Sequence, residues 1–431
     1  MKMKSFLSAV VLLAQPFLAA AQTVTYETKV LVQTIAGSGL FGYLDGKGTQ
    51  TMFNGPDGLT ADSKGNVFVW EQGNFRIRRI TADGTVTTFA GSGKPGYANG
   101  PGTFASFFPL GLGCAMVTDK DDNVYVADGA VIRRISPQGE VTTFAGSNVN
   151  PGYLDGPQFN ARFAGPLTLA FDLQGNLLVA DGFNKRIRRI STNAMVSTIA
   201  GSGNSGAQNG NGIFTSFGYP RGIAVDPAGN IFVGDTGNYL IRKITPAGDV
   251  TTFAGTVGQY GYQEGIGTNA ILRDMDILVA DKLGNLYVPD RSIIRKVTPQ
   301  GRVTALAGSY TDAGYADGEG SVAQLKHVTA IAIDQSGSLF AADYSDHRIR
   351  KISYEPVPTA AFTTFTIDMY AGLSISGLIG RSYRIEYSDS LSNSPAWTSA
   401  TTITLTSIPF VWFDGDSINA PKRFYRAILL P

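Results

Sequence analysis

The 431-residue chain has little of the chemistry on which many enzymes depend. It contains one cysteine, Cys114, and two histidines, His327 and His347. A single cysteine excludes an intrachain disulfide, and two imidazoles are too few for a histidine-rich zinc site. No serine lies in a Gly-x-Ser-x-Gly motif, the strand-to-helix turn that presents a nucleophile in many hydrolases. The sequence therefore supplies no catalytic residue, and we expect Cys114 to be a small buried apolar residue.

Charge of one sign is also missing. The 35 lysines and arginines almost balance 34 acidic residues, and charged residues make up only 16% of the chain. Proteins that bind nucleic acid need an excess basic surface. We therefore expect no nucleic-acid partner.

No apolar run is long enough to span a bilayer. The longest one near the N-terminus covers residues 6–18, follows Lys2 and Lys4, and precedes three alanines that end at Ala21. This pattern is typical of a signal peptide cleaved near Ala21. The sequence thus predicts a secreted or periplasmic bacterial protein, monomeric and without a membrane anchor, whose mature domains begin at residue 22.

Two motifs recur six times along the chain. One ends in Ala-Gly at Gly37, Gly91, Gly146, Gly201, Gly255 and Gly308, with spacings of 53–55 residues. The other places two basic residues between aliphatic ones, as in the segment Ile187–Ile190. A repeat of this length is too long for leucine-rich or ankyrin arrays.

One unit, residues 222–255, contains four β-rich runs separated by short turns that hold glycine and aspartate. Such a four-stranded antiparallel meander covers neither of its own faces, whereas packing several around an axis covers both, as in a β-propeller. The chain starts with an isolated fourth-strand copy at residues 30–37 and leaves the repeats after a third-strand copy at residues 348–353. We therefore predict an all-β fold with six four-stranded blades, in which the N-terminal strand closes the last blade.

The repeats resemble NHL repeats of secreted bacterial propellers. The resemblance rests on segments such as Asp181–Ile190 and Asp343–Ile352, and it covers roughly residues 30–353. It implies the propeller fold for residues 22–356, but it implies little about function, because one fold hosts many functions. The basic pairs recur in every blade, each after a strand that ends in a carboxylate, so we interpret them as structural ion pairs.

The repeat markers vanish after residue 356. Residues 357–431 contain several β-rich runs and resemble a small C-terminal module of secreted bacterial proteins. We predict a small β-sandwich with a role in adhesion, carbohydrate binding or sorting. Its aromatic residues Trp397, Trp412 and Tyr425 are expected mainly in the core.

A binding site should break the sixfold pattern. The position five residues before the aspartate that closes each first strand varies in type, and it belongs to the end of the propeller where the long interblade connections lie. We predict five ligand contacts at or near this position: Asp57, Arg221, Asp276, His327 and Arg273. The interblade connections also carry five tyrosines, which either stack against a ligand or fold back onto the blade.

The sequence predicts no cofactor, and the alternative is Ca²⁺ or a similar divalent ion. Asp57, Asp274 and Asp276 are the oxygen ligands that would hold it; salt-bridged or solvated carboxylates are the other interpretation. We predict a non-enzymatic scaffold that binds a polypeptide, glycan or small ligand through the loop-rich face and central mouth. The alternative is a metal-assisted hydrolase or lyase of the gluconolactonase type.

Overall fold

We analysed a computed structural model of the protein. It describes residues 28–108, 116–356, 371–375, 380–388, 396–405, 410–414 and 424–430. The predicted signal peptide and Cys114 lie outside these residues, as does the side chain of Trp412. The chain divides into two units: one comprises Thr28–Val357, and the other includes Pro358–Pro431.

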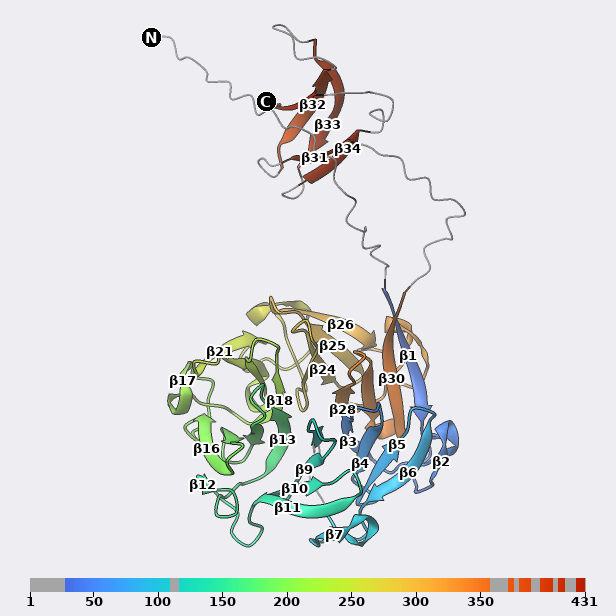
Figure 1. The fold of residues 1–431 in the computed structure, drawn as a ribbon, viewed down its shortest axis with the longest axis vertical. Coiled ribbons are helices and arrows are strands. Elements are labelled where there is room, and N and C mark those ends of the chain that lie inside the picture. Colours follow the sequence, from blue (N-terminus) through green and yellow to red (C-terminus); the bar gives the residue numbers. More distant parts are fainter. Residues whose placement is uncertain are drawn as a thin grey trace. The chain divides into compact units, whose positions relative to one another are not determined.

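The first unit is a ring of six antiparallel sheets around a central axis (Figure 1). From the axis outward, blades one to three consist of β3 (Pro56–Ala61), β4 (Val67–Glu71), β5 (Arg76–Ile80), β6 (Thr85–Ala90) and β2 (Gly46–Lys47); β8 (Met116–Thr118), β9 (Val124–Asp128), β10 (Val131–Ile135), β11 (Glu140–Gly146) and β7 (Gly100–Pro101); β13 (Pro166–Phe171), β14 (Leu177–Asp181), β15 (Arg186–Ile190), β16 (Met195–Ala200) and β12 (Gly156–Pro157).

Blades four to six have the same order. They consist of β18 (Pro220–Val225), β19 (Ile231–Asp235), β20 (Leu240–Ile244), β21 (Asp249–Ala254) and β17 (Gly210–Asn211); β23 (Val279–Ala280), β24 (Leu286–Asp290), β25 (Ile293–Val297), β26 (Arg302–Gly308) and β22 (Gly265–Ile266); β28 (Val328–Ile333), β29 (Leu339–Asp343), β30 (Arg348–Pro356), β1 (Thr28–Ala36) and β27 (Gly318–Glu319).

The predicted propeller is therefore confirmed, with one difference in each blade. We expected four strands in each blade, and each of the six sheets of the ring has five. The extra strand has two residues and comes from the connection that precedes the blade, which pairs with the outermost long strand before it turns inward. Short 3₁₀ helices follow five of the two-residue strands: η1 (Gly48–Gln50), η2 (Gly102–Phe104), η3 (Gly212–Phe214), η5 (Gly267–Asn269) and η6 (Gly320–Val322). Two more follow the second strands of blades four and six: η4 (Thr236–Asn238) and η7 (Tyr344–Asp346). None of the helices in the described part of the chain has the length and apolar character needed to cross a bilayer.

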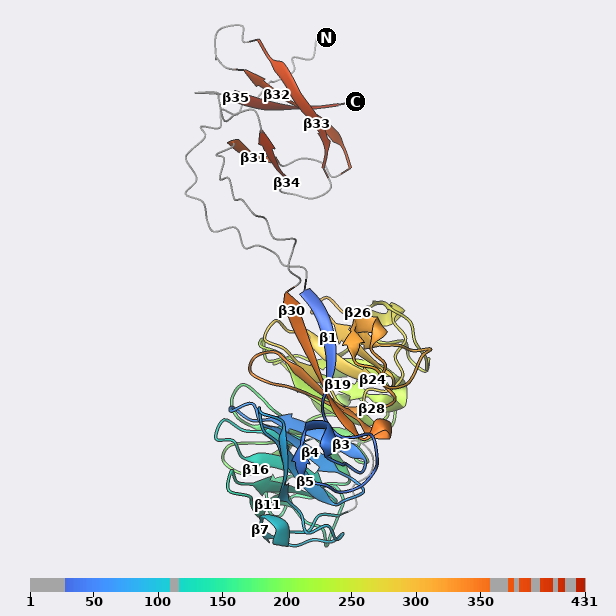
Figure 2. The same ribbon diagram turned by 90° about the vertical axis from the view of Figure 1, so that its right-hand side faces the viewer.

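The N-terminal strand closes the ring as predicted. β1 pairs antiparallel with β30, with Val32 opposite Ile352, and so completes the sixth sheet from the other end of the repeat region. Figure 2 shows these two strands lying side by side. Apolar side chains of adjacent sheets fill the spaces between blades, as where Trp70 of blade one packs against Phe107 of blade two.

The paired basic residues build the blades, as the sequence indicated. The first arginine of each pair is fully buried and forms an ion pair with the carboxylate that ends the preceding strand. The six pairs, with nitrogen–oxygen distances of 2.6–3.5 Å, are Arg78–Glu71, Arg133–Asp128, Arg188–Asp181, Arg242–Asp235, Arg295–Asp290 and Arg350–Asp343. Charge-assisted hydrogen bonds to backbone carbonyls satisfy other N–H groups, as in the Arg188 bond to the Leu154 oxygen.

The tyrosines of the interblade connections cover these arginines. Tyr153, for example, lies under the guanidinium carbons of Arg186 and Arg188 at 3.9 and 5.0 Å from its ring centroid. The same contact recurs for Tyr43, Tyr97, Tyr262 and Tyr315. Cation–π contact and the recurrence both support the interpretation in which the connection folds back onto its blade.

The C-terminal unit contains two small sheets in its described part. One pairs β31 (Ala371–Ile375) with β34 (Phe410–Asp414), and the other orders β33 (Thr398–Thr404), β32 (Ser382–Ser388) and β35 (Phe424–Leu429). Ile385 and Leu405 are its buried core residues. Glu386 is held by Arg384 and Arg426, and Arg426 lies over the Trp397 ring at 4.3 Å.

Candidate functional site

The axis of the propeller is a narrow channel lined by the inner strands β3, β8, β13, β18, β23 and β28. It encloses about 280 Å³, and most of its lining side chains are aliphatic. Each inner strand starts at the end where the interblade connections arrive and finishes at a short turn to the second strand. With about 3.3 Å per residue, a six-residue strand separates the two ends by roughly 20 Å. The channel therefore has two chemically separate ends.

The predicted ligand contacts lie at the end where the inner strands start. Arg221, the second residue of β18, forms an ion pair with Asp276, which precedes β23, with 2.9 Å between Nη1 and Oδ1. The two side chains are only 13% and 20% exposed. The structure thus joins two of the nominated residues across blades four and five.

Glycines in blade four make this ion pair possible. A Cβ atom added at Gly234 would overlap the carbonyl oxygen of Met275, and one added at Gly222 would lie 2.8 Å from the same oxygen. Because neither residue has a side chain, the segment around Met275 packs directly against β18 and β19. This close approach carries Asp276 to Arg221.

Burial changes the acid–base properties of Asp276. Removal from water disfavours the carboxylate and raises the pKa of Asp276 from 3.8 to about 6; Asp274 contributes in the same direction and Arg221 opposes it. Burial also raises the pKa of Tyr219, which directly precedes β18 and lies two residues before Arg221. Asp276 therefore changes its protonation state near neutral pH.

Arg273, Asp274 and His327 lie in the adjoining sector of blades five and six. Asp274 forms an ion pair with Arg291 at 3.4 Å, and Arg273 contacts the hydroxyl and the ring of Tyr260. The His327 ring packs edge-on against Tyr344, with centroids 6.2 Å apart. Burial lowers the pKa of His327, opposed by the charge of Asp274. His327 is thus a packed neutral imidazole at neutral pH.

The three carboxylates proposed as metal ligands do not form a ligand group. Asp57 lies fully buried in β3 of blade one, whereas Asp274 and Asp276 belong to blade five and are paired with Arg291 and Arg221. Within the described ranges, no three side chains of histidine, cysteine, aspartate or glutamate are placed to hold a metal ion. The residues present therefore do not fit the divalent ion considered from the sequence.

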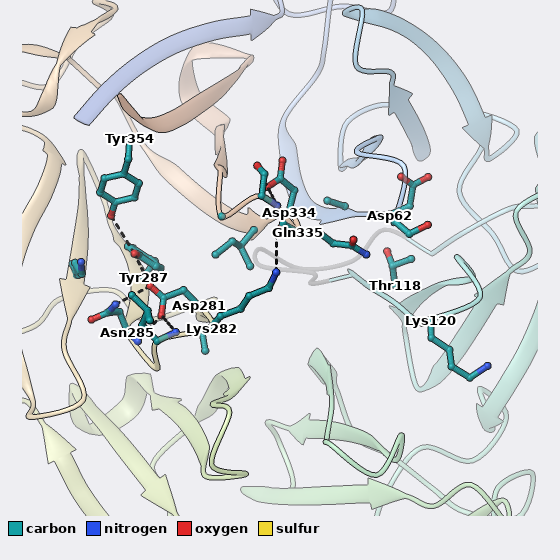
Figure 3. A pocket seen from close by; sticks show the side chains of 18 of the residues that line it. Asp62, Thr118, Lys120, Asp281, Lys282, Asn285, Tyr287, Asp334, Gln335 and Tyr354 are labelled. Atoms are coloured by element: carbon teal, nitrogen blue, oxygen red, sulfur yellow. Dashed lines mark hydrogen bonds between the residues drawn. The ribbon is translucent and has the colours of Figure 1, made fainter. Parts of the chain in front are cut away.

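A larger cavity lies at the other end of the channel, where the inner strands finish (Figure 3). Its volume is about 800 Å³, within the range of small-molecule sites. Blades five, six, one and two form its walls, and its polar lining includes Asp62, Thr118, Lys120, Asp281, Lys282, Lys296, Tyr287, Asp334, Gln335 and Tyr354. The sequence analysis did not nominate any of these residues.

The aspartates of this cavity are parts of the turns. Asp281 illustrates the arrangement: its Oδ1 accepts the backbone N–H groups of Leu283 and Asn285, and its Oδ2 accepts Asn285 and Tyr287. Asp62, Asp119 and Asp334 close their turns in a similar way. The aspartate is repeated in all six blades, so it is a structural residue.

The residue after each turn aspartate varies among the blades. It is Ser63, Lys120, Leu173, Pro227, Lys282 and Gln335 in blades one to six. Figure 3 shows the Lys282 side chain extending toward Gln335, and its Nζ donates to the backbone oxygen of Gln335 at 2.9 Å. Variation among otherwise equal repeats was used to select residues at the start of each inner strand. The same criterion would also have selected this position.

Tyr354 adds a second asymmetric feature. It lies in the part of β30 that pairs with β1, opposite Val30, where the other blades have a hairpin turn. Its hydroxyl is 3.1 Å from that of Tyr287, which in turn donates to Asp281 at 3.0 Å. Because Tyr287 has one hydroxyl hydrogen, Tyr354 is the donor in their bond and keeps its own lone pairs.

Comparisons with known proteins agree with this architecture. The NHL repeat family matches residues 217–244. The chain is 28% identical over 229 residues to the chloroplastic protein SUPPRESSOR OF QUENCHING 1 of Arabidopsis thaliana, a match that covers 49% of this chain and 22% of the relative. It is 30% identical over 175 residues to NHL repeat-containing protein 2 of Bos taurus, covering 37% of this chain and 24% of the relative. These matches span about a quarter or less of the relatives' own lengths.

Among solved structures, a protein of unknown function from Bacteroides thetaiotaomicron has a TM-score of 0.59 and 22% identity, with 77% of each chain covered. An auxiliary nutrient binding protein from Bacteroides ovatus has a TM-score of 0.57 and 18% identity, covering 77% of this chain and 78% of that one. A gluconolactonase from Xanthomonas campestris has a TM-score of 0.50 and 12% identity, covering 75% and 89%. At these identities the likeness concerns the fold alone. The chain is a β-propeller of six sheets that contains an NHL repeat.

Proposed function

We propose that the protein is a secreted, non-enzymatic binding scaffold that holds a small ligand in the cavity of Figure 3. The cavity itself carries the proposal: it has about 800 Å³ at the propeller axis, and residues of its walls such as Lys282 and Tyr354 break the sixfold pattern of the blades. Pockets with a few convergent polar groups are the usual sites of small-molecule binding. The similar fold of an auxiliary nutrient binding protein from Bacteroides ovatus supports such a role.

The position of the proposed site differs from the one expected from the sequence. The charged residues Arg221, Asp274 and Asp276 at the loop-rich end are engaged in ion pairs with protein partners. The cavity end offers more volume and has lysines without an ion-pair partner among the described residues. The metal-assisted hydrolase remains the alternative function, but Asp57, Asp274 and Asp276 do not meet as its ligands.

A tryptophan placed at the cavity mouth tests the proposal. Gln335 is exposed, so Gln335→Trp should fold and fill the cavity; Leu173 occupies the same turn position in blade three, outside the cavity, so Leu173→Trp is the matched control. Wild-type protein screened by thermal shift against sugars, sugar acids and short peptides should gain stability with at least one compound. That gain should vanish in Gln335→Trp and persist in Leu173→Trp.

Two results would contradict the scaffold. Equal responses of Gln335→Trp and the wild type would place binding elsewhere on the molecule. Hydrolysis of a sugar lactone that stops on addition of a chelator would replace the scaffold by the metal-assisted enzyme.

A further inference from the structure

The cavity has a surplus of hydrogen-bond donors. Its four aspartates, Asp62, Asp119, Asp281 and Asp334, already accept hydrogen bonds from the backbone of their own turns. Their negative charge is thus offset locally by N–H dipoles, and most of their acceptor capacity is used. A ligand in the cavity therefore meets mainly the lysine ammonium groups, which donate, and the Tyr354 hydroxyl, which donates to Tyr287 and can accept from the ligand.

Two of the three lysines are free to pair with a ligand. Lys120 forms an ion pair with its neighbour Asp121 at 2.9 Å. Lys282 and Lys296 form no ion pair with any residue in the described part of the chain. Lys282 donates one hydrogen to the Gln335 backbone and has two more, and the Lys296 ammonium lies 6.0 and 5.8 Å from the ring centroids of Tyr287 and Tyr354.

The channel beside Lys282 is apolar. The channel behind the cavity is lined mainly by aliphatic side chains such as Ile333 and Val279, which provide no competing acceptor. A cation at the rim of an apolar channel is less screened than one on an open surface. In Figure 3 the Lys282 side chain extends toward Gln335 among the other residues that line the cavity, so an anion bound there lies within its reach.

We infer that the ligand is a small organic anion, a sugar acid or a compound of similar size, whose carboxylate is bound by Lys282 with Lys296 as the second cation. This inference rests on the proposed function and adds the chemical class of the ligand. The sugar hydroxyls would bond to Gln335, Ser336 and Tyr354, which also line the cavity. Ligands of the same shape without the carboxylate would lose a hydrogen bond to a charged group.

A matched pair of sugars tests the inference. Titration calorimetry with glucuronate and with glucose should show at least about tenfold tighter binding of the anion, the ratio expected for one charge-assisted hydrogen bond. The preference should fall to within about threefold in Lys282→Met and should shrink as salt concentration rises. Lys243→Met is the control, because Lys243 has the strand position of Lys296 in blade four and lies over Phe232, outside the cavity.

A purely structural Lys282 gives a different result. In that case Lys282→Met would lower the melting temperature by breaking the bond to blade six, but it would leave the ratio of the two affinities unchanged. Equal affinity for glucuronate and glucose, lost in Gln335→Trp, would overturn the inference and leave the proposed function intact. Binding of neither sugar at millimolar concentration, with no other anion of the screen bound, would overturn the inference as well.

Discussion

Two kinds of arginine–carboxylate pair lie largely buried in the propeller: six pairs repeated within the blades, and the pair of Arg221 with Asp276 between two blades. Arg78, Arg133, Arg188, Arg242, Arg295 and Arg350 are fully buried and bridge the second and third strands of one blade. Arg221 reaches from blade four to Asp276 of blade five, and 13% of its side-chain surface is exposed. The same chemistry thus serves two purposes, since a repeated pair holds a sheet and a unique pair fixes the distance between two sheets.

The difference shows in how the partners are satisfied. Arg188 contacts Asp181 and Asp155 and donates to the backbone oxygens of Arg162 and Leu154. Asp276 has the Arg221 ion pair and a second carboxylate, Asp274, nearby, and burial raises the pKa of both Asp181 and Asp276. Removing the cation from either kind of pair leaves a buried carboxylate. The repeated pair also loses several supporting hydrogen bonds, so we expect it to be the costlier one to break.

Breaking one repeated pair gives the largest expected effect. Arg188→Met would leave Asp181 buried without its cation, which costs about 3–5 kcal/mol in the free energy of unfolding. Arg189→Met is the control, because Arg189 is the exposed member of the same basic pair and should change stability by less than about 0.5 kcal/mol. Urea denaturation measures both. Equal effects of the two substitutions would contradict the assignment of Arg188 to blade construction.

Most of the fold could be predicted because the blade motifs recur six times in the sequence. The Ala-Gly spacing predicted six blades, and the strand-end carboxylates predicted the ion pairs. The isolated terminal strands predicted the closure of the ring, and β1 pairs with β30 as that closure requires. The two-residue fifth strands were missed, because segments such as Gly46–Lys47 carry no β-strand signal and pair only after the blade exists. Tertiary contact, not local preference, forms them.

The candidate sites were less predictable. The comparison of repeats found Arg221 and Asp276, and the structure joins them. It did not reveal the cavity, because volume depends on how blades five, six, one and two are spaced around the axis, and no single residue encodes that spacing. Tyr354 was also missed, since it lies beyond the last repeat and enters the cavity only through the closure of blade six.

The unique pair can be tested through the glycine that makes room for it. The position of Gly234 is alanine in blades two, three and six, so comparison of the repeats alone expects Gly234→Ala to be neutral. The structure predicts a loss of about 1–3 kcal/mol, because the new methyl group overlaps the Met275 carbonyl oxygen. Thermal and urea unfolding measure the loss. An unchanged stability would mean that the Met275 segment does not pack against β19 as described.

The smallest effect is the pH dependence that the unique pair adds to that of the repeated carboxylates, whose pKa values burial also raises. Burial raises the pKa of Asp276 to about 6, so between about pH 4 and pH 6 the folded protein holds a proton that the unfolded chain has released. Stability contributed by this group is therefore present at the acidic side and is lost as the pH rises through that window. The loss should be about 1–2 kcal/mol, less than two full pKa units would give, because Asp276 retains some contact with water.

Asp276→Asn isolates this contribution from the other titrating groups, which both proteins share. The stability difference between the variant and the wild type should shift in favour of the variant as the pH rises from about 4 to about 7. The pKa of Asp276, followed by NMR of its carboxyl carbon, gives an independent value for the same group. Parallel pH profiles of the two proteins would show that Asp276 titrates as an ordinary surface carboxylate and would contradict its burial beside Arg221.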